Sequence, residues 1–268
     1  MVTRSSPGAP GTYLNSLYEL RDFAYPEEGY GDPEEGQSVV NAPDGSLVRL
    51  TVGDEPFDAR TGRLARHERT LDLRAGVLTR ETEWIAPGGG AVGVRSTRLV
   101  SFARPAIAVI AYEVRALETE VRIQLDSDLL ANAELPEQRD DPRAVTPIRN
   151  PLEPHRHSGE TAGGLLQHHT RRSGIRVAAA VGHRVHGAEH ELRDDAVPDR
   201  IRSTVTALLA PGEAVRLVKV VAYAWSDLHD ADRLAADGDP GPRRGTPRGP
   251  RRAPRRAACP AGPVLGRR

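Results

Sequence analysis

The sequence has a single cysteine, Cys259, in 268 residues. One cysteine cannot form an intramolecular disulfide or a cysteine-based zinc site, and it suits a reducing compartment. Apolar runs are also short: the longest spans 106–112, whereas a membrane helix needs roughly 20 residues. The first residues contain Arg4, Pro7 and Gly8 and no apolar secretory segment. We therefore expect a cytoplasmic protein with no membrane span.

Lysine is almost absent, since Lys219 is alone beside 36 arginines, a bias that suggests GC-rich coding. The net charge of zero hides two unlike parts. Residues 239–268 hold nine arginines and one acid, which leaves 28 basic and 36 acidic residues before them. An acidic body does not attract a phosphate backbone, so we expect no nucleic-acid partner. Nonspecific nucleic-acid binding by the basic tail is the less favoured alternative.

Helical periodicity is missing before residue 226, and alternation with a period of two takes its place. The alternating or strand–turn–strand segments are 47–52, 77–86 with 91–102, 121–125, 175–185, and 201–209 with 215–225. Pro87 and Gly88-Gly89-Gly90 mark a hairpin turn, not a phosphate cradle. Many strands at short spacing predict an all-β sandwich. We expect loops at 1–36, 131–154 and 155–172, and a disordered tail that is too poor in apolar residues to fold.

Catalytic motifs are missing too: there is no Gly-x-Ser-x-Gly, phosphate loop, Gly-x-Gly-x-x-Gly or His-Glu-x-x-His. Asp126 and Asp128 share a face by parity, and a carboxyl pair can serve glycoside chemistry. Such pairs also arise by chance at this composition. We favour a solvated or capping role and predict no catalytic and no cofactor-binding residue.

Seven histidines raise a metal hypothesis. They are His155, His157, His168, His169, His183, His186 and His190. His183 and His186 are three apart in an extended segment, so they should point to opposite faces. A pairing of His155 with His157 has no evident third ligand. We predict no metal-binding residue.

Aromatic residues make up only 4% of the chain. Trp84 and Trp225 lie within strand patterns, where we expect them to fill the core. Four tyrosines gather near the N-terminus: Tyr13, Tyr18, Tyr25 and Tyr30. Aromatic rings can also stack on sugars, so a carbohydrate-binding module stays open as an alternative.

Several segments in order resemble the N-terminal domain of glycoside hydrolase family 65, which contains maltose, trehalose and kojibiose phosphorylases. The run from Arg69 to Arg80, Arg-Thr-Leu-Asp-Leu-Arg-Ala-Gly-Val-Leu-Thr-Arg, is the most specific. The other matching segments are 11–15, 31–33, 40–44, Trp84 with Pro87, 96–101, 112–114, 129–132, 141–143 and 222–226. Ser16 stands where glycine is usual in the family, which leaves the turn conformation there open to question.

The resemblance implies a β-supersandwich of the galactose-mutarotase-like type, which in these enzymes precedes an (α/α)6 barrel. In the family the barrel carries the catalytic glutamate, inorganic phosphate is a co-substrate and no other cofactor is used. The substrate is an α-linked disaccharide, and the whole enzyme is expected to be a homodimer. No residue of this sequence matches the catalytic glutamate or the phosphate-binding residues.

We therefore expect a disordered start at 1–10, a partial family 65 β-sandwich domain at 11–228, incomplete at its N-terminal end, and a disordered tail at 229–268. The tail suggests a truncated or frameshifted gene. The expected function is that of an accessory, non-catalytic β domain of a disaccharide phosphorylase or glycosyl hydrolase that acts on α-glucosides. A stand-alone carbohydrate-binding module is the alternative.

Overall fold

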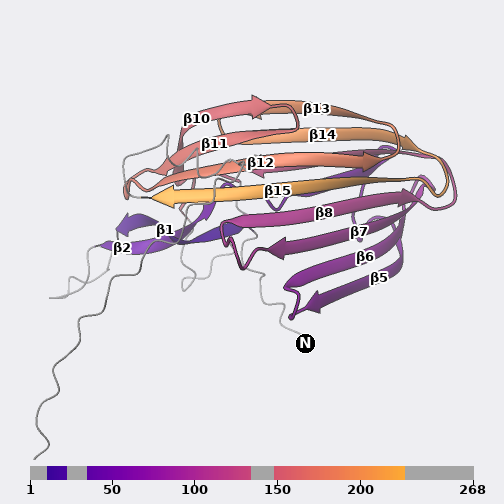
Figure 1. Cartoon of the computed structure of the whole chain (residues 1–268), viewed down its shortest axis with the longest axis horizontal. Coiled ribbons are helices and arrows are strands. Elements are labelled where there is room, and N and C mark those ends of the chain that lie inside the picture. The colour runs from indigo at the N-terminus through magenta and orange to yellow at the C-terminus, as the bar shows by residue number, and fades with distance from the viewer. Residues whose placement is uncertain (1–10, 23–34, 134–147, 227–268) are drawn as a thin grey trace, which may run out of the picture.

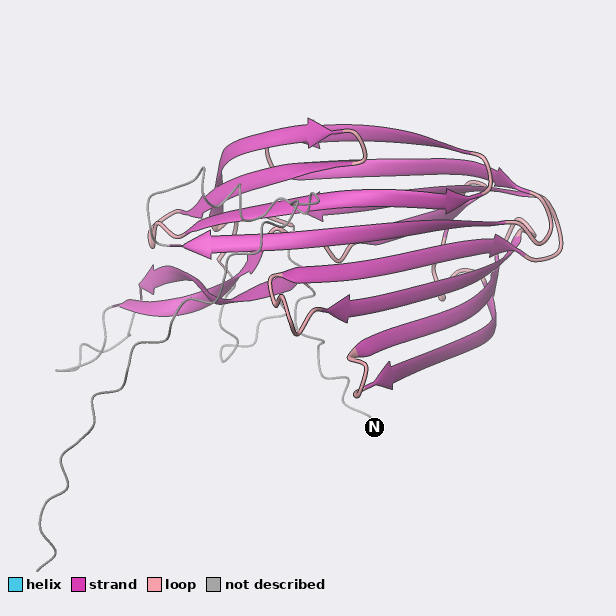
Figure 2. Ribbon diagram, in the orientation of Figure 1, coloured by secondary structure: helices cyan, strands magenta, loops and turns pink. Residues whose placement is uncertain are grey.

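The described residues of the computed structural model are 11–22, 35–133 and 148–226, and they contain strands but no helix (Figure 2). The strands follow one another as β1 (Thr12–Asp22), β2 (Glu35–Ala42), β3 (Val48–Val52), β4 (Glu55–Pro56), β5 (Arg63–Asp72), β6 (Val77–Ile85), β7 (Ala91–Val100), β8 (Ile107–Ala116), β9 (Val121–Leu130), β10 (Leu152–Glu160), β11 (Gly163–Thr170), β12 (Arg176–Gly187), β13 (His190–Val197), β14 (Arg200–Leu209) and β15 (Ala214–Ser226). In this part of the chain, no helix is long and apolar enough to cross a membrane.

Two large antiparallel sheets form a sandwich (Figure 1). The larger sheet has the order β10-β11-β12-β15-β8-β7-β6-β5, and the smaller has the order β13-β14-β9-β3-β4. A third sheet pairs β1 with β2 beside them. The all-β prediction is therefore confirmed.

Alternation explains which side chains enter the core. In β9, Ile123 and Leu125 are fully buried, whereas Arg122 between two buried neighbours is exposed. In β3, Leu50 and Val52 are buried on the predicted face. Side chains of a strand alternate between faces, so each strand can line the core with one face and meet solvent with the other.

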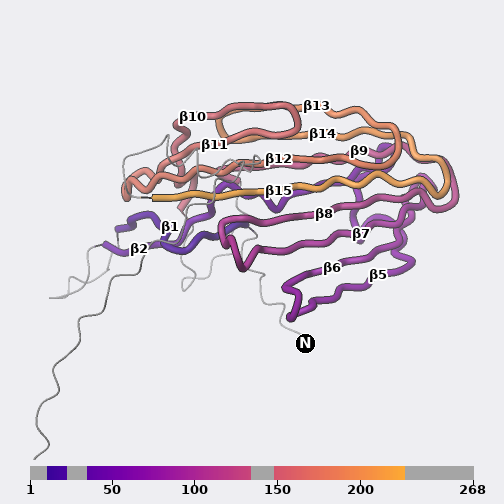
Figure 3. Tube along the Cα trace, viewed as in Figure 1, coloured from indigo at the N-terminus to yellow at the C-terminus, as the bar shows by residue number. Residues whose placement is uncertain are grey.

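The predicted hairpin between residues 77 and 102 is confirmed as β6 and β7. The segment from 201 to 225 also forms two strands, but they belong to different sheets. β14 pairs with β9 and β13, whereas β15 pairs with β8 and β12. The short turn between β14 and β15 thus joins the two layers (Figure 3).

Two loop predictions were wrong. Residues 155–172 form most of the β10–β11 hairpin, and β1 lies within 1–36. β10 is the outer strand of its sheet, and seven of its nine residues are polar or glycine, so it lacks the alternating pattern that marks a strand with one buried face. Residues 1–10 and the tail from 227 lie outside the described residues.

β1 contains a backbone conformation that most side chains avoid. Ser16 has φ 65°, and the β1–β2 register shifts between Tyr13 and Tyr18. Glycine adopts positive φ without the steric penalty of a Cβ atom. The question raised by Ser16 is therefore answered: the strand continues through an irregularity at this point, with serine in a conformation suited to glycine.

A layer of polar side chains divides the core of the sandwich. This polar layer consists of Ser127, His183, Ser203 and Lys219, all buried. On one side lies a cluster that includes Trp84, Leu125, Val205 and Leu217, and on the other a cluster that includes Leu129, Val181, Ile201 and Val221. Each of the four polar residues thus interrupts an apolar row of its own strand.

The sandwich is open beyond β7. The smaller sheet ends at the short strand β4, and every residue of β5 is exposed. At the other end of the sandwich β10 contacts β13 and β11 contacts β14. The inner face, by which we mean the face of the larger sheet that is turned toward the smaller one, is therefore accessible on β5 and on parts of β6 and β7.

Candidate functional site: an arginine-lined groove

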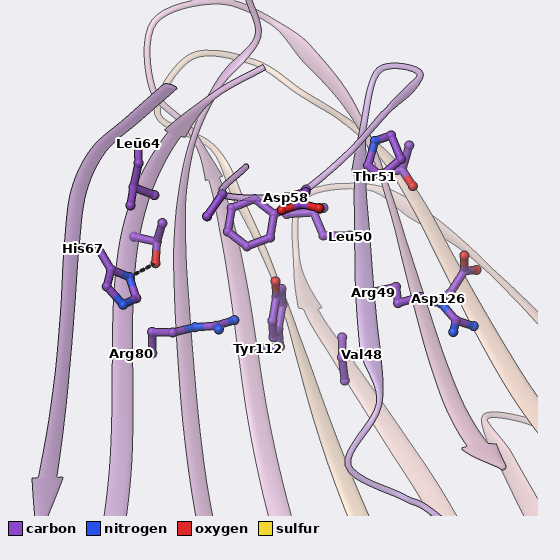
Figure 4. A pocket seen from close by; sticks show the side chains of 14 residues that line it. Val48, Arg49, Leu50, Thr51, Asp58, Leu64, His67, Arg80, Tyr112 and Asp126 are labelled. Carbon is purple, nitrogen blue, oxygen red and sulfur yellow. Dashed lines mark hydrogen bonds between the residues drawn. The ribbon is translucent and has the colours of Figure 1, made fainter. Parts of the chain in front are cut away.

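A groove of about 540 Å³ lies at the open side of the sandwich (Figure 4). Its lining comes from β3, from the segment 56–59, from Asp126 of β9, and from the inner face of β5, β6 and β8. The polar residues that line it are Arg49, Thr51, Asp58, His67, Arg80, Thr82, Tyr112 and Asp126. Phe57 lies edge-on against Trp84 at 5.3 Å, and these two rings support the groove from below.

Arg80, which lines one wall, has two arginine neighbours that the strand register brings close to it. Arg69 of β5 lies opposite Arg80 of β6, and Arg80 lies opposite Ser96 of β7. Arg98 follows two positions after Ser96 and so shares its face. Ser96 lies opposite Tyr112 of β8, which is buried in the core, so the whole row belongs to the inner face. We call Arg69, Arg80 and Arg98 the arginine face.

The charges of the arginine face act on one another. Partial burial lowers the pKa of Arg98, and the neighbouring cations Arg80 and Arg69 lower it further. Burial also raises the pKa of Tyr112 to about 12, against the opposing effect of Arg80 and Arg98. Tyr112 therefore stays protonated at neutral pH and can donate a hydrogen bond.

The opposite wall carries the carboxylates. Hydrogen bonds from Arg60 lower the pKa of Asp58 to about 2, and the two side chains approach to 2.6 Å. Asp126 accepts a hydrogen bond from Thr204 at 2.7 Å and others from Gln124. Both carboxylates thus have partners outside the arginine face.

The two aspartates considered for catalysis hold the smaller sheet together. Asp128 is 1% exposed and is bound by Arg49 on one side and by Arg202, at 2.7 Å, on the other. Asp126 bonds to Thr204 as described above. Both carboxyl groups are engaged by neighbouring strands, which favours the structural reading of this pair.

The histidines are spread over several places. Among the residues that the structure describes, no three His, Cys, Asp or Glu side chains gather in a way that could hold a metal ion. His155 and His157 are exposed on β10, and His186 is exposed near the end of β12. His169 pairs with Glu153 at 3.1 Å.

The remaining three histidines bond to groups of the protein itself. His190 Nδ1 lies 2.9 Å from the carbonyl oxygen of Ala188. His168 is buried with Nε2 2.8 Å from Asp199, and burial lowers its pKa. His183 points inward, opposite to the exposed His186, and belongs to the polar layer.

Within the polar layer, His183 joins three segments. Its Nδ1 lies 3.1 Å from the carbonyl oxygen of Ala162, and its Nε2 lies 2.8 Å from Ser127 Oγ. A carbonyl only accepts, so this pattern assigns the proton to Nδ1 and has Ser127 donate to Nε2. Burial, together with the nearby Lys219, lowers the pKa of His183 to about 4.

Lys219 crosses from the larger sheet to the smaller one. Its Nζ donates to the carbonyl oxygens of Asp128, at 2.5 Å, and Leu47, at 3.0 Å. Burial lowers the pKa of Lys219 to about 7, against the attraction of Asp128 and Asp44. Our reading of the sequence noted Lys219 only as a rarity. Its place in the run Val215, Leu217, Lys219, Val221 was the signal that could have identified it as an inner-face cation.

Of the aromatic side chains at the groove, Phe57 lines it and is partly exposed, whereas those of Trp84 and Tyr112 are not available to a sugar. Trp84 is 0% exposed and its Nε1 donates to the carbonyl oxygen of Asp58 at 3.1 Å. Tyr112 is also buried. Trp225 packs against the second core cluster, as predicted, whereas Tyr25 and Tyr30 lie outside the described residues. Tyr13 is half-exposed on β1, away from the groove lining.

Comparison with known proteins decides the family. The family described as "Glycosyl hydrolase family 65, N-terminal domain" matches residues 2–239. The chain belongs to glycosyl hydrolase family 65. This confirms the resemblance carried by the run from Arg69 to Arg80, and the match is wider at both ends than the segment 11–228.

Relatives of this family 65 domain include glycosyl hydrolases and phosphorylases. An uncharacterized glycosyl hydrolase of Mycobacterium tuberculosis (strain ATCC 25618 / H37Rv) is 48% identical over 85% of this chain and 29% of that protein. The alpha,alpha-trehalose phosphorylase of Thermoanaerobacter brockii is 28% identical over 84% of this chain and 30% of that protein. The chain thus spans less than a third of the length of these curated relatives.

A solved structure shows the same fold. A protein assigned as a kojibiose phosphorylase, from the human microbiome, superimposes with a TM-score of 0.70 over 84% of this chain and 28% of that chain. The two sequences are 14% identical, so this likeness concerns the fold alone. It agrees with the predicted sandwich of a family 65 N-terminal domain.

Proposed function

We propose that this family 65 domain is a non-catalytic accessory domain of a phosphorylase or glycosyl hydrolase that acts on an α-linked disaccharide. The observation that carries the proposal is the family match together with the coverage: the chain corresponds to less than a third of its curated relatives. The catalytic barrel expected from the family resemblance would belong to the remaining length of such an enzyme.

The state of the acids supports a non-catalytic role. A glycosidase or inverting phosphorylase needs a carboxylic acid that can give a proton to the leaving oxygen. Asp128 is buried between two guanidinium groups, and Asp58 is held by Arg60 with a pKa of about 2. With this low pKa, Asp58 cannot act as a general acid near neutral pH, and the carboxyl group of Asp128 is occupied by its two arginine partners.

The shape of the domain supports an accessory role. The exposed strand β5 and the apolar residues Leu71, Leu73 and Phe102 around its turn form an unpaired edge and an exposed apolar surface. Such surfaces are normally covered in the assembled protein. In the whole enzyme, other parts of the protein would cover these surfaces. We further expect that enzyme to be a cytoplasmic homodimer that uses inorganic phosphate as co-substrate.

An activity assay tests the proposal. The purified chain is incubated with inorganic phosphate and, in turn, maltose, trehalose and kojibiose, and sugar phosphate is measured. We expect none, with cooperative thermal unfolding as the proof that the sample is folded. Release of sugar phosphate by the folded chain, lost in Asp128→Asn but retained in an exposed control such as Asp195→Asn, would overturn the proposal.

A stand-alone carbohydrate-binding module is the weaker candidate. Sugar-binding sandwiches use exposed aromatic rings as stacking surfaces. At the groove the rings of Trp84 and Tyr112 are buried, and Phe57, which is partly exposed, packs edge-on against Trp84. Calorimetric titration with maltose and longer α-glucans should therefore give no binding heat. Saturable heat that disappears in Tyr13→Ala would move the function to the half-exposed ring on β1.

A further inference from the structure

The charged side chains on the two faces of β5, β6 and β7 differ in whether they form ion pairs. On the outer face acidic side chains have basic partners: Glu68 lies 3.0 Å from Arg66, and Glu81, which is directly opposite Glu68, lies 3.8 Å from Arg66 and 3.4 Å from Arg95. This is the ordinary arrangement of a solvated sheet surface, in which opposite charges on neighbouring strands offset one another.

The inner face of the same strands carries only cations. Arg69, Arg80 and Arg98 make no ion pair with any residue in the described part of the chain, and His67 adds an imidazole on the same side. Like charges directly opposite each other on neighbouring strands are destabilising, and Arg69 lies directly opposite Arg80. The repulsion between Arg69 and Arg80 is therefore present on the same strands whose outer face offsets its charges through ion pairs.

The register makes the three guanidinium groups neighbours. Arg69 and Arg80 are a direct cross-strand pair, and Arg98 is diagonal to Arg80 across β6 and β7. Diagonal neighbours are about 7–8 Å apart at the backbone, within the reach of long side chains. In agreement, the charges of both Arg80 and Arg69 are felt at Arg98. The three groups can therefore converge on one ligand.

The acids near the groove are already committed elsewhere. Asp44, which attracts Arg98, accepts hydrogen bonds of 2.8 Å from the Thr12 hydroxyl and from the Ser46 backbone N–H. Asp58 pairs with Arg60, and Asp126 bonds to the neighbouring strand through Thr204. None of them forms an ion pair with the arginine face, so its charge is left for a ligand.

We propose that the arginine face binds a phosphate group. A single carboxylate is satisfied by one guanidinium in a bidentate pair, whereas a tetrahedral dianion presents oxygens in several directions and can engage several guanidinium groups at once. The protonated Tyr112 hydroxyl and the imidazole of His67, whose Nδ1 lies 3.1 Å from Thr82 Oγ1, line the same groove and can donate to further oxygens.

The groove is also large enough for more than the phosphate. Its volume of about 540 Å³ is in the range of small-molecule sites, so the phosphate can be free inorganic phosphate or the phosphate of a small monoester. Both ligands present the same phosphate dianion to the arginine face, and the experiment below distinguishes inorganic phosphate from a monoester. This binding role does not depend on the proposed accessory function, because it concerns residues of the domain itself.

The test is calorimetric titration of the full chain in a chloride buffer, with inorganic phosphate in one arm and glucose 6-phosphate in the other. We expect saturable binding with a dissociation constant of about 1 mM or below. Tighter binding of inorganic phosphate assigns the free ion, and tighter binding of glucose 6-phosphate assigns a monoester. Acetate should not compete, and competition by acetate equal to that of phosphate would overturn the assignment to a dianion.

Variants identify the residues. Arg80→Gln and Arg69→Gln should each weaken phosphate binding about tenfold, the loss expected for one charge-assisted contact. The matched control is Arg95→Gln on the outer face of β7, which should change the affinity less than about twofold. Thermal unfolding confirms that each variant is folded. Absence of binding at about 20 mM phosphate, or equal affinities in Arg80→Gln and Arg95→Gln, would overturn the proposal.

Discussion

The inner face of the larger sheet holds cations in two settings. On the covered side, Lys219 is fully buried but donates to two carbonyl oxygens of the facing layer. On the open side, Arg80 lines the groove and hydrogen-bonds Tyr112, and Arg69 and Arg98 lie beside it on the same face. None of the three forms an ion pair with a described carboxylate. Both groups lie on one surface of one sheet, and Arg98 and Lys219 are both opposite Ile110 of β8.

This difference separates a structural role from a binding role. A buried cation must have partners within the fold, because an unsatisfied charge away from water is costly. Solvent-accessible cations that form no ion pair lower the stability of the fold only slightly, but their mutual repulsion does not stabilise it. The carbonyl partners of Lys219 therefore indicate a role in stability on the covered side. The lack of ion pairs in the arginine face indicates a role in ligand binding on the open side.

The largest expected difference between the sides concerns apolar contacts. Leu125→Ala removes a side chain that is 0% exposed, and we expect a loss of about 3 kcal/mol in the free energy of unfolding from the cavity it leaves. Leu71→Ala on β5, where the side chain is 58% exposed, should cost about 0.5 kcal/mol or less. Urea denaturation measures both. Similar losses would show that the open side is as well packed as the covered side.

Removal of the buried lysine is next in size. Lys219→Met keeps most of the side-chain volume but leaves the carbonyl oxygens of Leu47 and Asp128 without their donor. We expect a loss of about 2 kcal/mol near pH 10.5, where the folded amine is neutral and the loss of its proton on folding costs little. Arg216→Met, on the exposed face of the same strand, is the control and should stay within about 0.5 kcal/mol. An unchanged stability in Lys219→Met would remove the structural role.

The covered side also predicts a pH dependence. The pKa of Lys219 is about 7 in the folded state and 10.5 in its unperturbed state. Between these values the unfolded chain binds more protons, so stability should rise with pH from about 7 upward. Denaturation at about pH 6.5, 8 and 9.5 measures the rise, which Lys219→Met should lack. The range stops below 10 because Tyr112 and Tyr223, with pKa values of about 12, act in the opposite direction beyond it.

On the open side, removal of a cation should change the free energy of unfolding in the direction opposite to that expected for Lys219→Met. Arg98→Met takes away a partly buried charge that is repelled by Arg80 and Arg69. In phosphate-free buffer we expect the stability to be unchanged or higher by up to about 1 kcal/mol. Arg95→Met, which breaks an exposed ion pair with Glu81, should change it by less than about 0.5 kcal/mol. A clear loss in Arg98→Met would show that Arg98 supports the fold as Lys219 does.

The smallest effect concerns β1, whose partner β2 packs against the covered side. Ser16→Gly should raise stability by about 0.5 kcal/mol, because glycine adopts φ 65° without strain. Ser38→Gly in β2 is the control and should lower stability by a similar amount, since this residue has ordinary strand geometry. Thermal unfolding compares the two. A loss in both variants would mean that the Ser16 side chain contributes more than its backbone costs.

The sequence predicted the strands whose environment differs between faces. β9 and β12 alternate, and the turn at Pro87 marks the hairpin of β6 and β7. β10 and β13 are the outer strands at one side of the sandwich. β10 is polar on both faces, and β13 turns only Leu192 and Ala196 toward the core, so neither carries a clear alternating signal. The arginine face was equally hidden, because residues 69, 80 and 98 meet only through the register of three strands, which turn lengths and bulges determine.

The solitary lysine gives the chain an unusual chemical property. Amine-reactive reagents have only the N-terminal amino group and Lys219 Nζ to modify, and Lys219 is 0% exposed. Native protein should therefore take up one label, and a second label should appear only when the two layers separate. The rate of the second labelling would report how often the sandwich opens, without any engineered probe.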